Sequence, residues 1–172
     1  MRRLIVPALG LLAVALLAFP ISAGNTQLRS FGTGDVTITG NSATIVNDAG
    51  EYGGVYLNSK SWSAKLASVA MSFVSTGEDV FGGAPRFSIP IDTGGNAAVD
   101  GYAFIDVNSC GSPTVSTTSS SCMVYFNTEP APYANWAAFA AAHSDWRVAP
   151  GYIPFIIADV EGSFEVSDIQ LR

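Results

Sequence analysis

After residue 24 the chain alternates between apolar and polar positions in short segments, which Gly, Asn, Asp, Ser and Pro separate. Successive side chains of a strand point to opposite faces, so this pattern predicts strands with one buried and one exposed face. Many short strands at regular spacing are typical of a sandwich or a barrel. We expect strands over residues 35–39, 43–46, 53–58, 66–75, 86–91, 102–107, 123–126, 153–158 and 164–171.

Three of these segments carry further information. Apolar residues stand at every second position of 66–75, which predicts a long central strand with one buried face. Pro90 cannot donate a hydrogen bond to a ladder, so it belongs at an edge or at an unpaired position. In 164–171 the apolar parity switches, which predicts a β-bulge near Ser167 and Asp168.

One segment breaks the strand pattern. Residues 135–146 (NWAAFAAAHSDW) are rich in alanine, Trp136 and Phe139 stand three apart, and Asn135 is a suitable N-cap. We therefore predict one short helix within a connection between strands. Together with the strands, it indicates an all-β fold, a jelly-roll-like antiparallel β-sandwich with one short helix.

The first 23 residues have the pattern of a secretory signal peptide: two arginines, an apolar run and a small residue at the end. The run from Leu4 to Phe19 has 16 residues, whereas a membrane-spanning helix needs about 20. We expect cleavage near Ala23, no stable membrane span afterwards, and an extracellular protein with a single domain over 24–172. The alternative is an uncleaved N-terminal anchor.

Charge narrows the class of partners. Loss of residues 1–23 leaves six basic and fourteen acidic residues, a net charge of −8. Nucleic acid carries the same sign, so it is not an expected partner. The sequence does not predict the oligomeric state.

The two cysteines, Cys110 and Cys122, bracket the polar run GSPTVSTTSSS. An oxidising compartment favours their pairing, and a separation of 12 residues closes a loop easily. We predict a structural disulfide. The alternative, a zinc site, needs three or four ligands, and the chain offers these two cysteines and the single His143.

Several segments resemble secreted jelly-roll modules of the carbohydrate-binding type. The C-terminal FEVSDIQLR resembles their closing strand, and GEYGGVYLN, WSAKLASVAMSF and GAPRFSIPID stand in the order of their early and middle strands. The resemblance implies the sandwich fold and a polysaccharide or glycoconjugate ligand. It also implies a structural calcium held by Asp168 and by an acid from an early strand, since calcium takes oxygen ligands. Glu51 is our candidate for that acid, although it does not lie in a matching motif.

Candidate ligand-binding residues follow from the chemistry of sugars, whose C–H faces stack on flat aromatic rings. Trp62 lies in the polar segment NSKSWSAK, and Tyr52 and Tyr56 are near it in sequence. Asp106 has the strand parity of Tyr102 and Phe104, so it faces either the edge of the sandwich interior or a ligand groove. The alternative for many aromatic residues is core packing, which we expect of Phe87, Phe104, Phe126, Phe155 and Phe164.

Signals for catalysis are weaker. No G-x-S-x-G pentapeptide occurs, and His143, Ser144 and Asp145 are consecutive, so on a helix their side chains diverge. We therefore favour a secreted, non-catalytic binding module for polysaccharide or glycoconjugate. The first alternative is a secreted structural protein of the cell wall or matrix, and the second is a small glycosidase or polysaccharide lyase.

Overall fold

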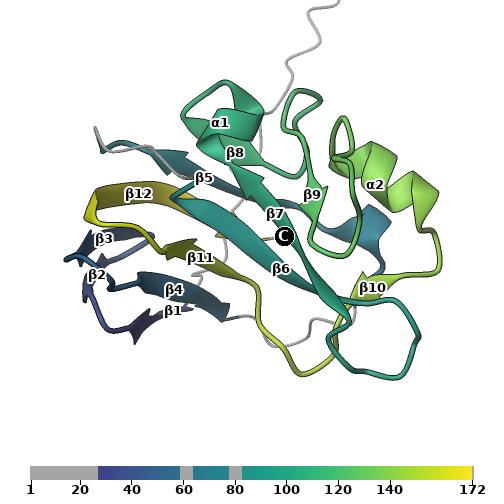
Figure 1. Cartoon of the computed structure of the whole chain (residues 1–172), viewed down its shortest axis with the longest axis horizontal. Helices are drawn as coiled ribbons and strands as arrows, with labels where there is room; N and C mark the ends of the chain where they lie inside the picture. Colours follow the sequence, from purple (N-terminus) through teal and green to yellow (C-terminus); the bar gives the residue numbers. More distant parts are fainter. Residues whose placement is uncertain (1–26, 59–63, 78–82, 172) are drawn as a thin grey trace, which may run out of the picture.

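The computed structural model describes residues 27–58, 64–77 and 83–171, which form two antiparallel β-sheets packed face to face (Figure 1). The seven-stranded sheet has the order β1-β4-β11-β6-β7-β9, with β10 also paired to β6, and the five-stranded sheet has the order β2-β3-β12-β5-β8. The strands of the first are β1 (Gln27–Gly32), β4 (Gly53–Asn58), β6 (Arg86–Asp92), β7 (Gly101–Asp106), β9 (Tyr125–Phe126), β10 (Arg147–Val148) and β11 (Phe155–Ala158). Those of the second are β2 (Asp35–Thr39), β3 (Ser42–Asn47), β5 (Met71–Ser75), β8 (Thr114–Ser116) and β12 (Gly162–Leu171).

The strand order is that of a jelly roll. The pairs β3–β12, β4–β11, β5–β8 and β6–β7 are nested, and they alternate between the two sheets as the chain advances. Eight strands in two sheets with this nesting form a jelly roll. The predicted fold class is confirmed, and β1, β2, β9 and β10 extend it.

The core lies between the inner faces of the sheets. Apolar side chains of alternate positions are buried there, and the Phe73 and Phe87 rings, one from each sheet, meet edge to face at 4.8 Å between centroids. Phe126 and Phe164 are also buried, as expected. Phe104 is not in this core: it lies on the outer face of β7, and Phe155 lies on the outer face of β11.

The prediction of one strand over 66–75 was wrong in its first half. Leu66–Ser68 form a short 3-10 helix, η1, and the strand begins only at Met71. Leu66 is buried while Ala67 is exposed, the reverse of the predicted parity. The cause is tertiary, because the carbonyl of Leu66 accepts a hydrogen bond of 2.8 Å from the indole of Trp136.

Pro90 occupies an interior strand. It pairs with Tyr102 of β7 on one side of β6, but it has no partner in the described ladders on the opposite side. On that opposite side β6 pairs with β11 as far as Ser88, and it pairs with β10 from Ile91 onward. Pro90 falls between these two ladders, and its carbonyl accepts a hydrogen bond of 3.0 Å from Ala149. A residue without an N–H fits at such a gap.

The predicted bulge in the last strand is present. The pairing of β12 with β5 shifts register between Ser167 and Gln170, and Asp168 has a φ of 49°. Phe164 and Val166 are buried before the bulge and Ile169 after it, so the bulge keeps both stretches facing the core.

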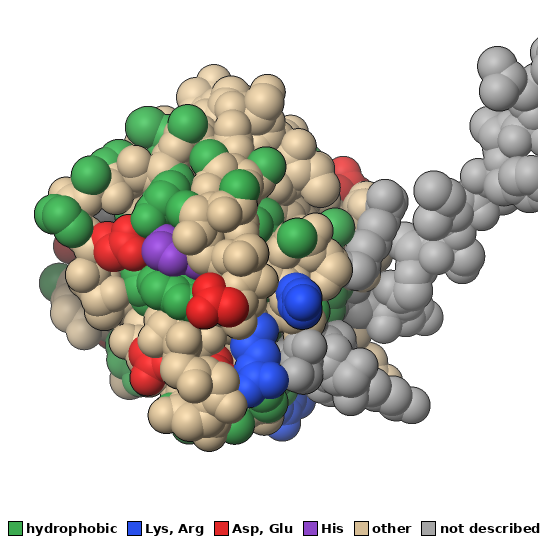
Figure 2. Space-filling view, turned by 90° about the vertical axis from the view of Figure 1, so that its right-hand side faces the viewer, with side chains coloured by type: hydrophobic (Ala, Val, Ile, Leu, Met, Phe, Trp, Pro, Cys, Tyr) green, Lys and Arg blue, Asp and Glu red, His purple; other side chains and the backbone are tan. Residues whose placement is uncertain are grey.

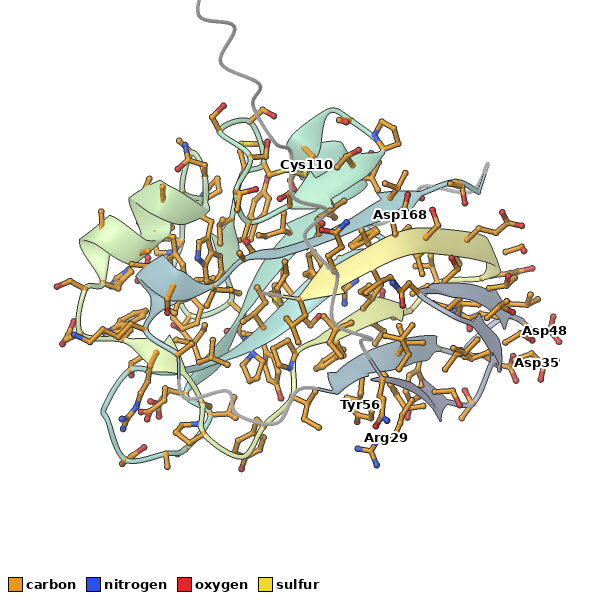
Figure 3. The ribbon with its side chains drawn as sticks, turned by 180° about the vertical axis from the view of Figure 1, so that it is seen from behind. Arg29, Asp35, Asp48, Tyr56, Cys110 and Asp168 are labelled. Atoms are coloured by element: carbon orange, nitrogen blue, oxygen red, sulfur yellow. A yellow bond between two sulfur atoms is a disulfide. The ribbon has the colours of Figure 1, made fainter. Side chains whose placement is uncertain are left out.

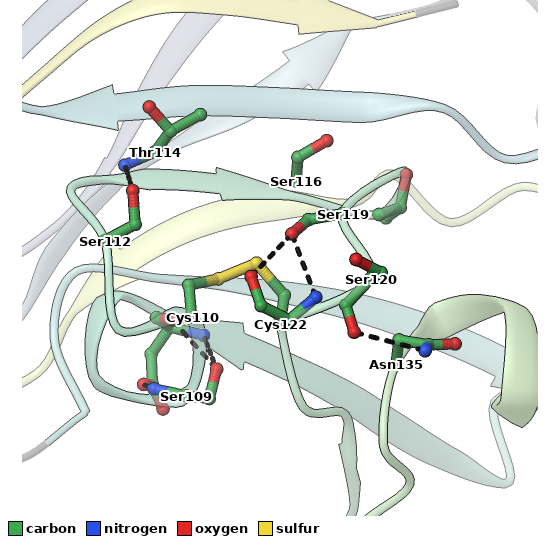
Figure 4. Close-up of a disulfide and its surroundings, with 12 residues drawn as sticks. Ser109, Cys110, Ser112, Thr114, Ser116, Ser119, Ser120, Cys122 and Asn135 are labelled. Carbon is green, nitrogen blue, oxygen red and sulfur yellow. Dashed lines mark hydrogen bonds between the residues drawn. A yellow bond between two sulfur atoms is a disulfide. The ribbon is translucent and has the colours of Figure 1, made fainter.

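The disulfide between Cys110 and Cys122 is formed, as predicted. The run between the cysteines is more than a loop: after the four-residue helix α1 (Val107–Cys110) it contributes β8 to the five-stranded sheet. The strand that we predicted over residues 102–107 therefore ends one residue earlier, and Val107 begins α1. The bridge joins the points where the chain leaves and re-enters the seven-stranded sheet (Figure 4).

The alanine-rich segment forms α2 (Trp136–Ala142), and the Asn135 side chain accepts a hydrogen bond of 2.9 Å from the Ala138 N–H as its N-cap. With seven residues, α2 is the longest α-helix in the described part of the chain, and none there is long and apolar enough to cross a membrane. The predicted signal peptide, residues 1–23, lies outside the described residues.

Candidate functional site

A row of aromatic side chains crosses the outer face of the seven-stranded sheet. Tyr56 of β4 is in register with Phe155 of β11, and Phe155 is in register with Ser88 of β6. Ser88 pairs in turn with Phe104 of β7, which pairs with Tyr125 of β9. Residues that share a register position and a face lie in a line perpendicular to the strands.

Strand alternation explains why these rings point outward. Val55 and Leu57 are fully buried on the inner face of β4, so Tyr56 between them faces away from the core. Ala103 and Ile105 of β7 are also fully buried, so Phe104 between them faces away from the core as well. The rings are half-buried, apart from Tyr125, which is exposed.

Two further rings complete what we call the aromatic surface: Phe31, Tyr56, Tyr102, Phe104, Tyr125 and Phe155. Phe31 lies 4.4 Å from Tyr56 and 5.3 Å from Phe155 between ring centroids. Tyr102 lies 6.0 Å from Phe155 and 6.4 Å from Phe104. Five rings thus form a continuous series of contacts, which fixes their orientation before any ligand arrives.

Small residues make room beneath the rings. Ser88 is 1% exposed, although its side chain is on the outer face, because Phe155 and Phe104 flank it. Gly54 lies under Phe31: a Cβ added there would stand 2.5 Å from the Phe31 ring and 2.3 Å from the Ile156 carbonyl oxygen.

Two arginines border the aromatic surface. The Arg29 guanidinium lies 6.0 Å from the centroid of Tyr56, next to which Figure 3 shows it, and that of Arg86 lies 5.3 Å from the centroid of Phe104. Arg86 also donates two hydrogen bonds to Asp159, of 2.6 and 2.5 Å. These bonds hold the pKa of the Asp159 carboxyl below its ordinary value.

Among the predicted ligand-binding residues, Tyr56 lies within this surface. Tyr52 is exposed just before β4, and its backbone carbonyl accepts hydrogen bonds from Thr33 and Gly34. Asp106 shares the outer face, in register with Arg86, but its carboxylate accepts a hydrogen bond from the Ser109 N–H as the N-cap of α1. Trp62 lies outside the described residues.

The two predicted calcium ligands have separate surroundings. Asp168 is exposed at the bulge of β12, while Glu51 accepts a hydrogen bond from the Asp48 N–H in the turn before β4. Figure 3 shows Asp168 well apart from Asp48. Within residues 27–58, 64–77 and 83–171, no three His, Cys, Asp or Glu side chains cluster as a metal site would require, and calcium binding by Asp168 stays a prediction.

His143 belongs to a cluster that sequence spacing does not reveal. It ends α2, its Nε2 lies 2.7 Å from the Tyr133 hydroxyl, and it lies 3.2 Å from the Glu129 carboxylate. Tyr133 donates a hydrogen bond to Glu129, and this bond together with burial raises the pKa of Tyr133 to about 12. These contacts anchor the end of α2 instead of preparing Ser144 as a nucleophile.

Asp92 is a fully buried acid, and its role is structural as well. Its carboxylate accepts hydrogen bonds from the N–H groups of Gly95, Asn96 and Ala97 and from Arg147. Burial raises the pKa of this carboxyl, but the hydrogen bonds outweigh burial and hold the pKa below its ordinary value. An acid that is kept ionised by four donors organises a loop and is a poor proton donor.

Comparison with protein-family models, with curated proteins and with solved structures finds no match for this chain. The assignment of a function therefore depends on the aromatic surface itself.

Proposed function

We propose that this protein is a secreted, non-catalytic module that binds polysaccharide or glycoconjugate on the aromatic surface. The observation that carries the proposal is the in-register line of Tyr56, Phe155, Phe104 and Tyr125 across four neighbouring pairs of strands. Aromatic rings offer apolar area to the C–H faces of sugars, while tyrosine hydroxyls and charged groups at the border bind sugar hydroxyls.

The dimensions suit an extended chain. Tyr56 and Tyr125 are four strand spacings apart, which is roughly 19 Å at about 4.8 Å per spacing. The ring contacts already hold the aromatic side chains in place, so binding costs little additional side-chain entropy.

The outer face of the other sheet provides a control. It carries mainly hydroxyl and other polar side chains, for example Thr37, Thr44 and Ser167, around a shallow hollow of about 260 Å³. The two outer faces therefore differ in chemistry, and substitutions on the five-stranded sheet test whether binding depends on the aromatic surface alone.

The test is retention on insoluble glucan, xylan and chitin. Tyr56→Ala and Tyr125→Ala should each weaken binding by roughly tenfold, since each removes one stacking ring. Val46→Ala, which removes an exposed apolar side chain from the five-stranded sheet, should leave it unchanged. Trp62→Ala in the same assay tests the remaining predicted ligand-binding aromatic residue.

Two results would contradict the proposal: retention on none of the polymers, or undiminished retention when Tyr56 and Tyr125 are both replaced by Ala. Thermal unfolding of each variant separates loss of binding from loss of the fold.

The second candidate is a secreted structural or interaction protein that uses the same surface against protein. A half-buried aromatic surface of this kind is also typical of protein interfaces. Light scattering over a range of concentrations distinguishes the two: self-association that Tyr125→Ser abolishes favours this candidate, and a monomer that binds polysaccharide favours the first.

A further inference from the structure

A groove of about 560 Å³ lies between η1, residues 117–120 and α2. Figure 2 views the molecule from the side that carries α2. The volume of the groove is within the range of small-molecule binding sites. No residue of the aromatic surface lines it, so this site is separate from the proposed polysaccharide site.

The floor of the groove is apolar and rigid. Leu66, Trp136 and Ala140 line it, and each is less than a tenth exposed. The indole N–H of Trp136 already donates to the Leu66 carbonyl, at 2.8 Å, so the ring needs no polar partner in the groove. A ligand that covers this floor must therefore have an apolar body.

The facing wall is polar and is fixed at several points. The Thr117 hydroxyl accepts a hydrogen bond of 2.9 Å from the Met71 N–H, and the Asn135 side chain donates one of 3.3 Å to the Ser120 carbonyl. The Cys110–Cys122 bridge closes the loop that carries this wall, and Figure 4 shows Ser119 and Ser120 beside it. The hydroxyls of this wall are also bonded to one another and to the backbone: Thr118 to Ser116, Ser119 to Ser121, and Thr117 to the Val69 carbonyl.

The charge of the lining is opposite to that of the whole chain. The chain has a net charge of −6, yet the fifteen lining residues include Lys65 and no Asp or Glu. His143, which also lines the groove, is already in contact with the Glu129 carboxylate at 3.2 Å. In the described part of the chain, the ion pairs involve Arg86, Arg147 and His143, which leaves Lys65 without an acidic partner. Lys65 is therefore the charged group of the lining that favours an anion.

We propose that this groove binds a small amphipathic anion, a carboxylate or sulfonate on an aliphatic or aromatic body. The body covers Leu66, Trp136 and Ala140, and the anionic group pairs with Lys65. Charge-assisted hydrogen bonds of this kind are stronger than neutral ones.

The test uses octanoate and octan-1-ol as probes, titrated into the full mature chain by calorimetry. Lys65→Gln should weaken octanoate binding by about tenfold and leave octan-1-ol unchanged, because it removes one charge-assisted contact. Ala141→Trp fills the groove from an exposed position of α2 and should abolish binding of both probes. Ala142→Trp, on the same helix but outside the lining, is the matched control and should bind like the wild type.

Absence of octanoate binding to the wild-type chain, or equal binding by the Ala141→Trp variant, would overturn the proposal. Equal affinity of wild type and Lys65→Gln for octanoate would overturn its anionic part. The polymer assay keeps the two sites distinguishable, since Ala141→Trp should retain polysaccharide binding and Tyr56→Ala should retain octanoate binding.

Discussion

Gly54 shows how a single small residue allows an aromatic ring to lie close to the backbone of a sheet. A Cβ at position 54 would stand 2.5 Å from the Phe31 ring and 2.3 Å from the Ile156 carbonyl oxygen, so a side chain there would clash with both. Because Gly54 has no side chain, the Phe31 ring can reach Tyr56 and Phe155. The aromatic surface depends on a residue that is itself not aromatic.

Gly54→Ala is therefore expected to lower the free energy of unfolding by about 1 to 3 kcal/mol, since overpacking forces neighbouring groups to move. It should also weaken polysaccharide binding by displacing Phe31. Denaturant unfolding measures the first effect and polymer retention the second. Gly94→Ala is the matched control, because a Cβ there would meet nothing closer than 3.8 Å; equal losses in both variants would contradict this explanation.

The Arg86–Asp159 pair predicts a dependence of stability on pH. Its hydrogen bonds lower the folded-state pKa of Asp159 below the ordinary 3.8. A depressed carboxyl pKa stabilises the fold above the ordinary value, and this stabilisation is lost as pH falls through the folded-state value. The difference in melting temperature between wild type and Asp159→Asn should be largest near neutral pH and should shrink below pH of about 4.

Thermal unfolding followed by circular dichroism between pH 2.5 and pH 7 measures this difference. Thr37→Ala, on the outer face of the other sheet, serves as the control for a surface substitution. A constant difference over the whole pH range would show that Asp159 acts through packing and not through its charge.

At the scale of elements, the chain between β7 and β9 crosses from one sheet to the other and back. It contributes β8 to the five-stranded sheet. Among the described strands, β8 pairs with β5 alone. A three-residue edge strand gains little from its own hydrogen bonds, so the disulfide across its base is important for holding it.

Removing that disulfide is expected to destabilise the protein by about 3 kcal/mol, the loop-closure value for a loop of this length. The double variant Cys110→Ser, Cys122→Ser tests it by denaturant unfolding, with the reduced wild-type chain as a second measurement of the same loss. The groove loses its fixed wall in either case, so octanoate binding should weaken as well. Unchanged stability in both would contradict a structural role for the bridge.

At the scale of the whole molecule, one core joins the two sheets to α2. Trp136 and Phe139 of the helix belong to the same buried cluster as the inner faces of the strands. The Phe73–Phe87 contact joins one sheet to the other. We therefore expect the domain to unfold as one unit.

Phe73→Ala tests that expectation. Phe73 is fully buried, so its truncation should lower the free energy of unfolding by about 3 to 5 kcal/mol through lost burial and the cavity that remains. Fluorescence, which reports on tryptophan near the helix, and circular dichroism, which reports on the sheets, should follow one transition. Two separate transitions would show that the helix and the sandwich unfold independently.

Local pattern was sufficient for much of the fold. Alternation located nine of the strands in whole or in part, the parity switch located the bulge at Asp168, and the capping residue located the start of α2. Each is a property of a few neighbouring residues. The pattern failed where distant residues intervene, as at Leu66, whose conformation Trp136 stabilises from 70 residues away.

The difference between local pattern and contacts of distant residues also applies to the candidate site. Apolarity alone suggested that Phe104 and Phe155 are core residues, because a sequence shows the chemistry of a side chain but not the face of the sheet it occupies. The line from Tyr56 to Tyr125 exists only because five strands from distant parts of the chain align in register. The sequence by itself determined which segments become strands and helix, through local alternation and capping. Only the tertiary structure decided which aromatic side chains meet on one face, since that follows from strand order and register, which are interactions between segments far apart in the chain.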